Sequence, residues 1–367
     1  MSVQSPLRPK PGILDIAPYR GGEADAPGFE RPIRLASNES ALGPSAKAIA
    51  AYRTLAADIH RYPDGGADVL RHELARHHGL VAERIVCGNG SDELIGLLTR
   101  AYPGVGDEVV MSRHGFLMYP IAAKAAGATP VSAPEKDLTA DVDALLAMVT
   151  PRTRIVFLAN PNNPTGSYLS SDAVKRLHEG LPKSVLLVID AAYAEFVQRN
   201  DYDPGAALVD ANENVVMTRT FSKIYALGGL RVGWAYCSAS VADVLNRVRA
   251  PFNLNGAAQA AAVAALEDVP AVDRAREHND IWRPWLAREL EALGLAVNPS
   301  VANFLIVRFS GVGGKTADAA FDFLKARGIL TRKIGGYQLP EWIRITIGTE
   351  EEMRAVVKAC SEFLRGP

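Results

Sequence analysis

Thr220-Phe221-Ser222-Lys223, followed by Gly228-Gly229-Leu230-Arg231, joins two apolar, strand-like runs at residues 214–217 and 232–236. The segment combines an amine, hydroxyl groups and a guanidinium with flexible glycines. A lysine amine can bond covalently to an aldehyde, and serine and arginine donate hydrogen bonds to phosphate. The pattern therefore favours a site for an aldehyde that carries a phosphate group, although the same residues are also typical of a solvated loop.

Short β-branched runs alternate with amphipathic helical patterns on the N-terminal side of this segment. Strands are expected at residues 84–87, 109–111, 129–132, 154–159, 185–190, 215–218 and 232–236, and helices at 68–78, 92–102, 119–126, 142–148 and 171–179. This alternation predicts an α/β fold whose mostly parallel central sheet is covered by helices on both faces.

The C-terminal third of the chain has a different pattern. Helices are expected at 241–248, 256–266, 273–293, 317–326 and 350–364, and strands at 304–308, 329–332 and 342–346. We predict a large domain over residues 35–260 and a smaller α+β domain over 261–367 that packs with part of the N-terminal segment. Residues 1–34, which are rich in proline and glycine, are expected to form an arm over the surface or over a partner subunit.

Composition narrows the function classes. The 367 residues carry a net charge of −1 and the pI is near 6.7, so charge gives no support for binding nucleic acid or a membrane surface. Cys87, Cys237 and Cys360 lie far apart in the sequence and are expected to be reduced thiols. No signal-peptide pattern is present at the N-terminus, and a cytoplasmic enzyme is the expectation. His72 and His77 point apart on a helix, so no metal site is predicted.

Three turn-rich segments follow predicted strands, at the edge where open α/β sheets bind ligands. In the first, Ser91 and Asp92 follow a glycine turn at the start of a helix, where unpaired N–H groups attract phosphate. The second, residues 160–166, contains Asn163 between prolines that restrict the backbone. The third is a buried strand that ends in Asp190, with Tyr193 close behind. Each segment alone is also compatible with an ordinary capped turn.

These segments together fit one cofactor, pyridoxal 5′-phosphate (PLP). Lys223 would hold the aldehyde, and Asp190 would pair with the protonated ring nitrogen, which keeps the ring an electron sink. Asn163 and Tyr193 would contact the ring hydroxyl, and Phe116 would stack on the ring. The phosphate would be surrounded by hydroxyl, carboxylate and guanidinium groups: Ser91, Asp92, Ser222 and Arg231. Thr220 is a further candidate for binding the cofactor.

The chain resembles the fold-type I PLP-dependent aminotransferases, and closely their histidinol-phosphate aminotransferase branch. The resemblance extends from Pro18-Tyr19 to the last helix. The motifs that carry it are Asn38-Glu39, Gly43-Pro44-Ser45, Arg61-Tyr62-Pro63-Asp64-Gly65, Asn162-Asn163-Pro164-Thr165-Gly166, Asp190-Ala191-Ala192-Tyr193-Ala194-Glu195-Phe196, Thr220-Phe221-Ser222-Lys223, Gly229-Leu230-Arg231 and Arg344-Ile345-Thr346-Ile347-Gly348-Thr349.

The resemblance implies roles that spacing does not reveal. Tyr62 matches a tyrosine that reaches the phosphate from the neighbouring subunit, which implies a homodimer. Arg344 matches the arginine that binds the substrate carboxylate, with Asn38 close by and Tyr19 in an arm over the substrate. The chain departs from the family at Ala191, where glutamate is usual, at Ser40-Ala41, and at Gly21-Gly22-Glu23 in the arm.

We therefore predict transamination between L-histidinol phosphate and 2-oxoglutarate, which yields imidazole acetol phosphate and glutamate. Lys223 is the expected general base and Asp190 the partner of the ring. Histidinol phosphate has no carboxylate, so Arg344 would bind its phosphate in one half-reaction and the glutamate carboxylate in the other, with Arg332 as a candidate assistant. The alternatives are an aromatic amino acid aminotransferase, a PLP-dependent lyase such as a threonine-phosphate decarboxylase, and a cofactor-sensing regulator domain.

Overall fold

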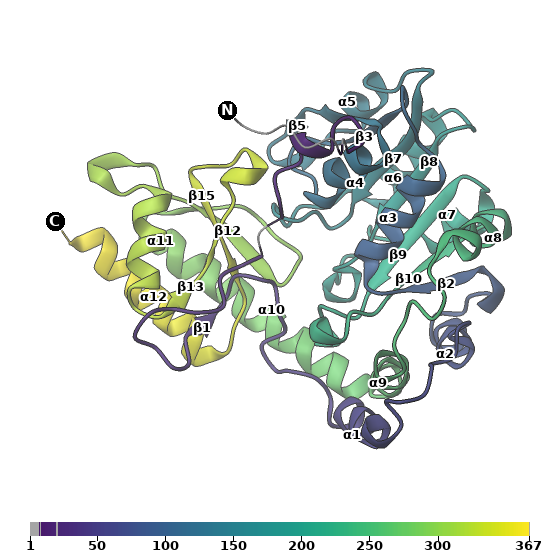
Figure 1. The fold of residues 1–367 in the computed structure, drawn as a ribbon. Coiled ribbons are helices and arrows are strands. Elements are labelled where there is room, and N and C mark those ends of the chain that lie inside the picture. Colours follow the sequence, from purple (N-terminus) through teal and green to yellow (C-terminus); the bar gives the residue numbers. More distant parts are fainter. Residues whose placement is uncertain (1–6, 8, 20, 367) are drawn as a thin grey trace.

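The computed structural model describes residues 7, 9–19 and 21–366, and its centre is a seven-stranded sheet (Figure 1). The strand order is β2-β10-β9-β8-β7-β3-β4. Every neighbouring pair is parallel except the two pairs that involve β10. The strands are β2 (Ile85–Gly88), β3 (Glu108–Ser112), β4 (Thr129–Ala133), β7 (Thr153–Ala159), β8 (Leu186–Asp190), β9 (Val215–Thr220) and β10 (Gly233–Cys237). The predicted α/β fold with a mostly parallel central sheet is confirmed.

Helices cover both faces of this sheet, and its central strands, such as β8, are therefore mostly apolar on both sides. On β8, Leu187 and Ile189 point into one hydrophobic core, while Leu186 and Val188 point into the other. The first core is closed by α2 (Asp68–His78), α5 (Val142–Ala147), α6 (Ser171–Gly180) and α9 (Gly256–Leu266). The second is closed by α3 (Ser91–Ala101), α4 (Met118–Ala126) and α8 (Ala239–Val248). The helix α7 (Ala206–Ala211) adds Val209 to the first core, and β5 (Glu135–Lys136) and β6 (Thr139–Ala140) form a separate two-stranded hairpin.

A second, antiparallel sheet lies in the C-terminal part of the chain, in the order β11-β12-β15-β14. Its strands are β11 (Ala296–Val297), β12 (Phe304–Arg308), β14 (Arg332–Lys333) and β15 (Trp342–Thr346). It packs with α10 (Val269–Ala292), α11 (Ala317–Lys325) and α12 (Glu350–Arg365) around a separate core. The N-terminal segment joins this part of the molecule, because β1 (Ile33–Arg34) pairs in parallel with β13 (Ile329–Leu330) and Leu35 enters the same core.

The short elements β1, β5, β6, β11 and α7 were not predicted, and two further differences from the sequence predictions have a clear physical reason. The strand expected at 329–332 is divided: β13 pairs with β1 and β14 pairs with β15, so that one short run serves two sheets. Helix α1 (Ala46–Thr54) was not predicted. It begins at the N-cap Ser45, whose side chain accepts a hydrogen bond from the Ala48 amide, but only Ala48 of its residues is buried. A helix without an apolar stripe leaves no periodic signal in the sequence.

The topology places the carboxyl ends of β7 and β8 beside the loop that follows β9. Asp190 is the last residue of β8 and lies opposite Ala159 of β7 and Thr218 of β9. Within the described residues, no helix is both long and apolar enough to cross a membrane. The same part of the chain contains no group of three or more side chains arranged to hold a metal ion.

Candidate active site

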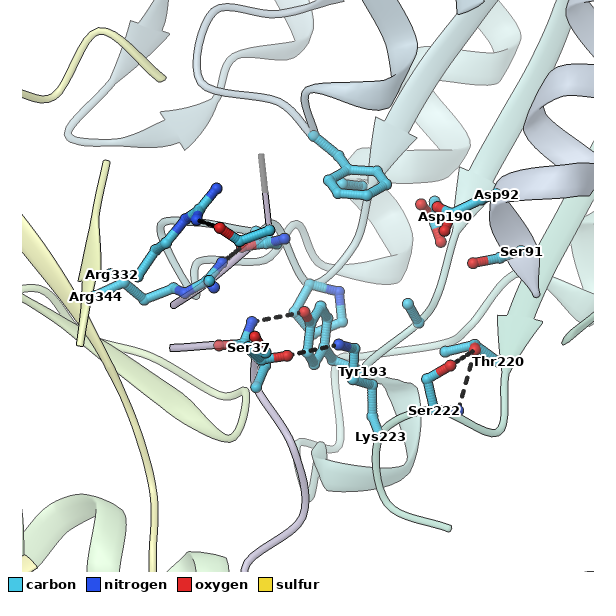
Figure 2. Close-up of a pocket in the computed structure, with 18 of the residues that line it drawn as sticks. Ser37, Ser91, Asp92, Asp190, Tyr193, Thr220, Ser222, Lys223, Arg332 and Arg344 are labelled. Atoms are coloured by element: carbon cyan, nitrogen blue, oxygen red, sulfur yellow. Dashed lines mark hydrogen bonds between the residues drawn. The ribbon is translucent and has the colours of Figure 1, made fainter. Parts of the chain in front are cut away.

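A cavity of about 300 Å³ opens at the carboxyl ends of the central strands, and the small sheet forms its opposite wall. Figure 2 shows Arg332 and Arg344 on one side, Asp190, Asp92 and Ser91 on the other, and Lys223 with Tyr193 between them. The predicted site residues that line this cavity are Tyr19, Asn38, Ser91, Asp92, Phe116, Asn163, Asp190, Tyr193, Thr220, Ser222, Lys223, Arg231, Arg332 and Arg344. The structure thus brings together residues that span more than 300 positions of the sequence.

Lys223 follows β9 and its side chain points into the cavity. Its Nζ donates a hydrogen bond to the main-chain oxygen of Ser37, 3.3 Å away. Burial, and then the positive charge of Arg344, lowers the pKa of the Lys223 amine to about 8. A lysine with this pKa has a substantial neutral fraction near neutral pH, and the neutral amine is the form that attacks a carbonyl carbon or accepts a proton.

Asp190 is buried, yet both of its carboxylate oxygens are hydrogen-bonded. Tyr119 donates its hydroxyl to Oδ2 at 2.8 Å, and Thr218 donates to Oδ1 at 3.2 Å. Burial raises the pKa of the Asp190 carboxyl to about 6, while these two hydrogen bonds and the Ala192 amide act in the opposite direction. A carboxylate in this setting gains from a cationic partner, because an unpaired buried charge is costly.

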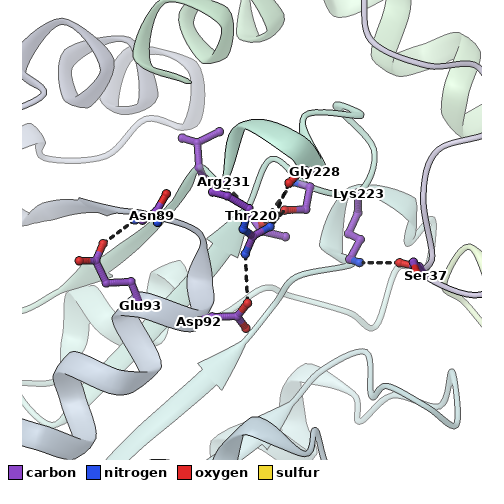
Figure 3. A network of polar contacts seen from close by, with 10 residues as sticks. Ser37, Asn89, Asp92, Glu93, Thr220, Lys223, Gly228 and Arg231 are labelled. Carbon is purple, nitrogen blue, oxygen red and sulfur yellow. Dashed lines mark hydrogen bonds and ion pairs between the residues drawn. The ribbon is translucent and has the colours of Figure 1, made fainter. Parts of the chain in front are cut away.

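Arg231 is the centre of a polar network beside the first turn of α3 (Figure 3). Its guanidinium donates to Ser222 Oγ at 3.2 Å and forms an ion pair with Asp92 at 3.0 Å. The Ser222 amide donates to Thr220 Oγ1 at 3.1 Å. The N-cap of α3 is Gly90, whose φ of 84° favours glycine and which offers no side-chain cap. The free N–H groups of α3, two hydroxyls and a guanidinium form a donor set for an anion.

Two glycines make room for this donor set. A Cβ at Gly90 would collide with the Arg231 guanidinium, and a Cβ at Gly233 would collide with the amide nitrogen of Ser91. Close approach of the backbone therefore depends on glycine at both positions.

Arg332 and Arg344 lie on the opposite wall. They are direct neighbours across the β14–β15 pair, so both side chains project from the same face of the small sheet. Arg344 is only 5% exposed. It donates to the Asn163 side-chain oxygen and, at 2.7 Å, to the main-chain oxygen of Ala36. Its Nε is buried without a hydrogen-bond partner among the described residues. Arg332 donates to the main-chain oxygen of Gly21 in the N-terminal arm.

Tyr193 and Asn38 connect the two walls. Asn38 donates its side-chain amide to the Tyr193 hydroxyl at 2.8 Å, and its own amide nitrogen donates to Thr346 Oγ1 at 3.0 Å. Burial raises the pKa of Tyr193 to about 12, so the hydroxyl keeps its proton at neutral pH and is available as a donor.

Comparison with known proteins places this arrangement in a family. A family model described as aminotransferase class I and II matches residues 30–359. The chain belongs to this family. It is 60% identical over 356 residues to the histidinol-phosphate aminotransferase of Paramagnetospirillum magneticum, covering 97% of this chain and 98% of that protein. It is also 60% identical over 358 residues to the histidinol-phosphate aminotransferase of Rhodospirillum centenum, covering 98% and 99%.

A solved structure gives the same result for this aminotransferase. The crystal structure of histidinol-phosphate aminotransferase from Sinorhizobium meliloti in complex with pyridoxal-5′-phosphate superposes with a TM-score of 0.90. The two sequences are 33% identical, and the alignment covers 99% of each chain. The resemblance read from the sequence and the predicted fold type are both confirmed.

One predicted site residue lies outside the cavity of this aminotransferase. Tyr62 is 83% exposed and stacks on Phe252, with ring centroids 4.7 Å apart. The cavity of its own chain does not include it. This position is compatible with a role in a neighbouring subunit, which stays a prediction.

Asn163 occupies the cavity in an orientation that the sequence did not specify. Its side-chain oxygen accepts a hydrogen bond from Arg344, so any contact to a bound ring falls to its amide nitrogen. It therefore lies at the junction between the wall of the central sheet and the wall of the small sheet.

Sequence reasoning missed Tyr119 and Thr218, which bind both oxygens of Asp190. Tyr119 follows Phe116 by three residues, across the turn that leads into α4, and this closeness in sequence was the available signal that the two rings are neighbours. Thr218 had no local signal, because its place opposite Asp190 depends on the register of β8 and β9.

Proposed function

We propose that this aminotransferase moves the amino group of L-histidinol phosphate to 2-oxoglutarate with PLP as cofactor, and so forms imidazole acetol phosphate and glutamate. The observation that carries the proposal is the pair of neighbouring arginines, Arg332 and Arg344, across the cavity from Lys223. Two guanidinium groups suit the phosphate of histidinol phosphate, with its three acceptor oxygens and nearly two negative charges, better than the single carboxylate of an aromatic amino acid. The names of the relatives at 60% identity support the same substrate.

The residues of the central-sheet wall fit PLP. When bound, PLP supplies an aldehyde carbon that takes up the amino group and a ring that withdraws electrons. Lys223 Nζ is the group for the aldehyde, and Asp190 is the carboxylate for the ring nitrogen. The donor set around Arg231 and the first turn of α3 suits the phosphate, and the space kept open by Gly90 and Gly233 lets a phosphate reach the backbone.

These residues would divide the work of the reaction. Lys223 would hold the aldehyde of PLP in the resting enzyme, and its free amine would accept the proton from Cα of the amino donor. A pKa of about 8 suits this exchange near neutral pH. Asp190 stabilises positive charge at the ring nitrogen, and the Tyr193 hydroxyl, which keeps its proton, donates to an oxygen of the cofactor.

The wall of the small sheet orients the substrate. Arg344 binds the phosphate of histidinol phosphate in one half-reaction and the carboxylate of glutamate in the other. Its Nε, which has no hydrogen-bond partner among the described residues, can donate to either anion. Arg332, anchored to Gly21, assists and couples the arm to substrate binding. Tyr19 of the arm lines the cavity and covers the substrate.

The active unit in this proposal is a homodimer in which Tyr62 contributes to the phosphate site of the partner subunit. Exposed apolar side chains lie within a few residues of Tyr62 in the sequence: Ile59 is 83% exposed and Val69 is 71% exposed. An apolar groove of about 240 Å³ lined by Pro44, Ile49, Tyr52 and Leu230, among others, lies between α1 and the loop before β10. A second copy of the chain would bury these side chains.

Mixed dimers test the role of Tyr62. Chains with Lys223→Ala and chains with Tyr62→Ala are refolded together in equal amounts. If Tyr62 acts across the interface, one site in each mixed dimer keeps both residues, and activity returns to about a quarter of the wild-type value. If activity stays at the level of the two separate variants, the cross-subunit role of Tyr62 is wrong.

We also propose a cytoplasmic location and a division of the chain at about residues 34 and 260. Cys87, Cys237 and Cys360 are free and buried, as suits a reducing compartment. All strands of the central sheet lie between residues 85 and 237, and all strands of the small sheet lie between 296 and 346. The pairing of β1 with β13 supports the packing of part of the N-terminal segment with the small domain.

Half-reactions of the purified holoenzyme test the substrate. Histidinol phosphate, glutamate, phenylalanine and tyrosine are added separately while the visible absorbance of the bound cofactor is followed. We expect histidinol phosphate and glutamate to remove this absorbance at concentrations at least about 10²-fold lower than the aromatic acids, a difference within the reach of two charged hydrogen bonds. Conversion by the aromatic acids alone would make the protein an aromatic aminotransferase, and conversion by none would point to a lyase.

A further inference from the structure

Tyr119 does not line the cavity, but its side chain binds Asp190, which does. It is completely buried in α4, and its hydroxyl donates to Asp190 Oδ2 at 2.8 Å. Its ring stacks on Phe157 of β7 with a centroid distance of 4.5 Å and an angle of 2° between the planes. The ring therefore has little freedom to turn, and the hydroxyl is held on one oxygen of the carboxylate.

The other oxygen of Asp190 has a donor of its own. Thr218, also completely buried, lies directly opposite Asp190 on β9 and donates to Oδ1 at 3.2 Å. Donors on both oxygens, from two different elements, fix the rotation of the carboxylate about its own axis. The free edge is then aimed at the cavity that Asp190 lines.

The charge balance around Asp190 shows what these donors do. The groups that face it are Tyr119 from α4, Asp92 from α3, Thr218 from β9 and Tyr193 after β8. Burial and the negative charge of Asp92 raise the pKa of Asp190, and the Tyr119 and Thr218 hydroxyls lower it. With a pKa of about 6, most of the Asp190 carboxyl is ionised at neutral pH. A further rise of about one unit in this pKa would leave only about half of it ionised.

We propose that Tyr119 and Thr218 are positioning residues that keep Asp190 ionised and aimed at the ring nitrogen of the cofactor. Tyr119 also packs edge-on against Phe116, with centroids 5.8 Å apart, and Phe116 lines the cavity. Tyr119 thus contacts both Asp190, the predicted partner of the cofactor ring nitrogen, and Phe116, which is predicted to stack on the cofactor ring. The inference rests on the proposed PLP chemistry but not on the identity of the amino donor.

Tyr119→Phe tests the proposal, because it removes the hydroxyl and keeps the ring. Loss of one hydrogen bond to a buried carboxylate raises the pKa of Asp190 by about one unit. Asp190 then takes up its proton at a higher pH, so the acid-side midpoint of the pH profile of kcat shifts upward by about one unit. We expect kcat to fall about twofold at pH 7 and about fivefold at pH 6, because the ionised fraction of Asp190 falls by these factors, and the KM for glutamate to change little. The pH titration of the visible absorbance of the bound cofactor should shift in the same direction.

Tyr236→Phe is the matched control. Tyr236 is also completely buried and donates its hydroxyl to a carboxylate, that of Asp210, at 2.6 Å, but neither residue lines the cavity. It should leave the acid-side midpoint and the absorbance titration unchanged. An unchanged midpoint in Tyr119→Phe, or an equal shift in Tyr236→Phe, would overturn the proposal.

A second pair of variants covers the case in which Tyr119→Phe does not fold. Thr218→Val removes the donor to the other carboxylate oxygen with little change of shape, and Thr218→Ser keeps it. The proposal requires an upward shift of the acid-side midpoint in Thr218→Val and none in Thr218→Ser; equal behaviour of the two contradicts it. Glutamate is the donor in all these measurements, so a failure of histidinol phosphate as substrate is recognised separately.

Discussion

The two walls of the cavity are held in different ways. On the wall of the central sheet, residues of the large domain bond to one another: Arg231 to Ser222 and Asp92, and Asp190 to Thr218. On the wall of the small sheet, the two arginines bond instead to main-chain oxygens of the N-terminal segment. Arg332 reaches Gly21 and Arg344 reaches Ala36, which are 311 and 308 residues away in the sequence. The first wall is built mainly by the central sheet and its helices, with one contact from Lys223 to the main-chain oxygen of Ser37, whereas both arginines of the second wall depend on the N-terminal segment.

Because the two walls are held differently, substitutions in them should affect different properties of the enzyme. Changes in the wall of the central sheet should alter cofactor binding and proton transfer. Changes in the wall of the small sheet, or in the N-terminal segment that supports it, should alter the affinity for both substrates and leave cofactor binding intact. Each variant below is therefore measured twice, by the Kd for PLP and by steady-state kinetics with histidinol phosphate and 2-oxoglutarate.

The largest effect is expected for Lys223→Ala. The variant lacks both the amine that holds the aldehyde and the proton acceptor, so kcat should fall by at least about 10³-fold. The visible absorbance of the lysine-bound cofactor should be lost, while the thermal unfolding midpoint should stay within a few degrees of the wild type. A variant that keeps this absorbance together with turnover would remove Lys223 from its assigned role.

Arg344→Ala comes next and tests the opposite wall. It removes the guanidinium that binds both substrates, so kcat/KM should fall about 10²-fold for histidinol phosphate and for 2-oxoglutarate alike. The Kd for PLP should change less than about twofold. Arg344→Lys is the control for charge: it keeps the positive charge but loses bidentate geometry, and we expect only partial recovery. A large loss of PLP affinity in either variant would contradict the separation of the two walls.

Gly90→Ala should damage the wall of the central sheet alone. The φ of 84° strains alanine, and its Cβ would displace the Arg231 guanidinium, so the Kd for PLP should rise between about tenfold and 10²-fold. Gly96→Ala in the same helix is the control, because a Cβ there meets nothing within 4 Å. That substitution should raise the free energy of unfolding by about 0.5–1 kcal/mol and leave the Kd unchanged. Equal Kd values for the two variants would show that the donor set around Arg231 does not depend on glycine at position 90.

The same contrast explains what the sequence could and could not predict. The residues of the central-sheet wall lie in compact motifs at strand ends, so Lys223 and Asp190 could be proposed from local pattern and chemistry. The role of Arg344 came only from resemblance to a family, because nothing near it in sequence marks its contact with the N-terminal segment. Tyr119 and Thr218 were missed because strand register and helix packing bring them to Asp190. Strand order in the sheet was likewise outside the reach of local pattern.

The smallest effect is expected for Gly22→Ala, which tests the N-terminal segment directly. A Cβ at this position would lie 2.6 Å from Ala36 Cβ and 2.7 Å from Ser37 Oγ, so the arm or the segment at 36–37 must shift. Because Ala36 supplies the main-chain acceptor of Arg344, we expect the KM for both substrates to rise about fivefold, as for a mild overpacking that costs about 1 kcal/mol. Gly21→Ala, next in the chain but with nothing within 4 Å of the new Cβ, should leave KM unchanged. If both variants behave alike, contact of the arm with residues 36–37 does not position Arg344; a rise in the Kd for PLP would show instead that the arm supports both walls.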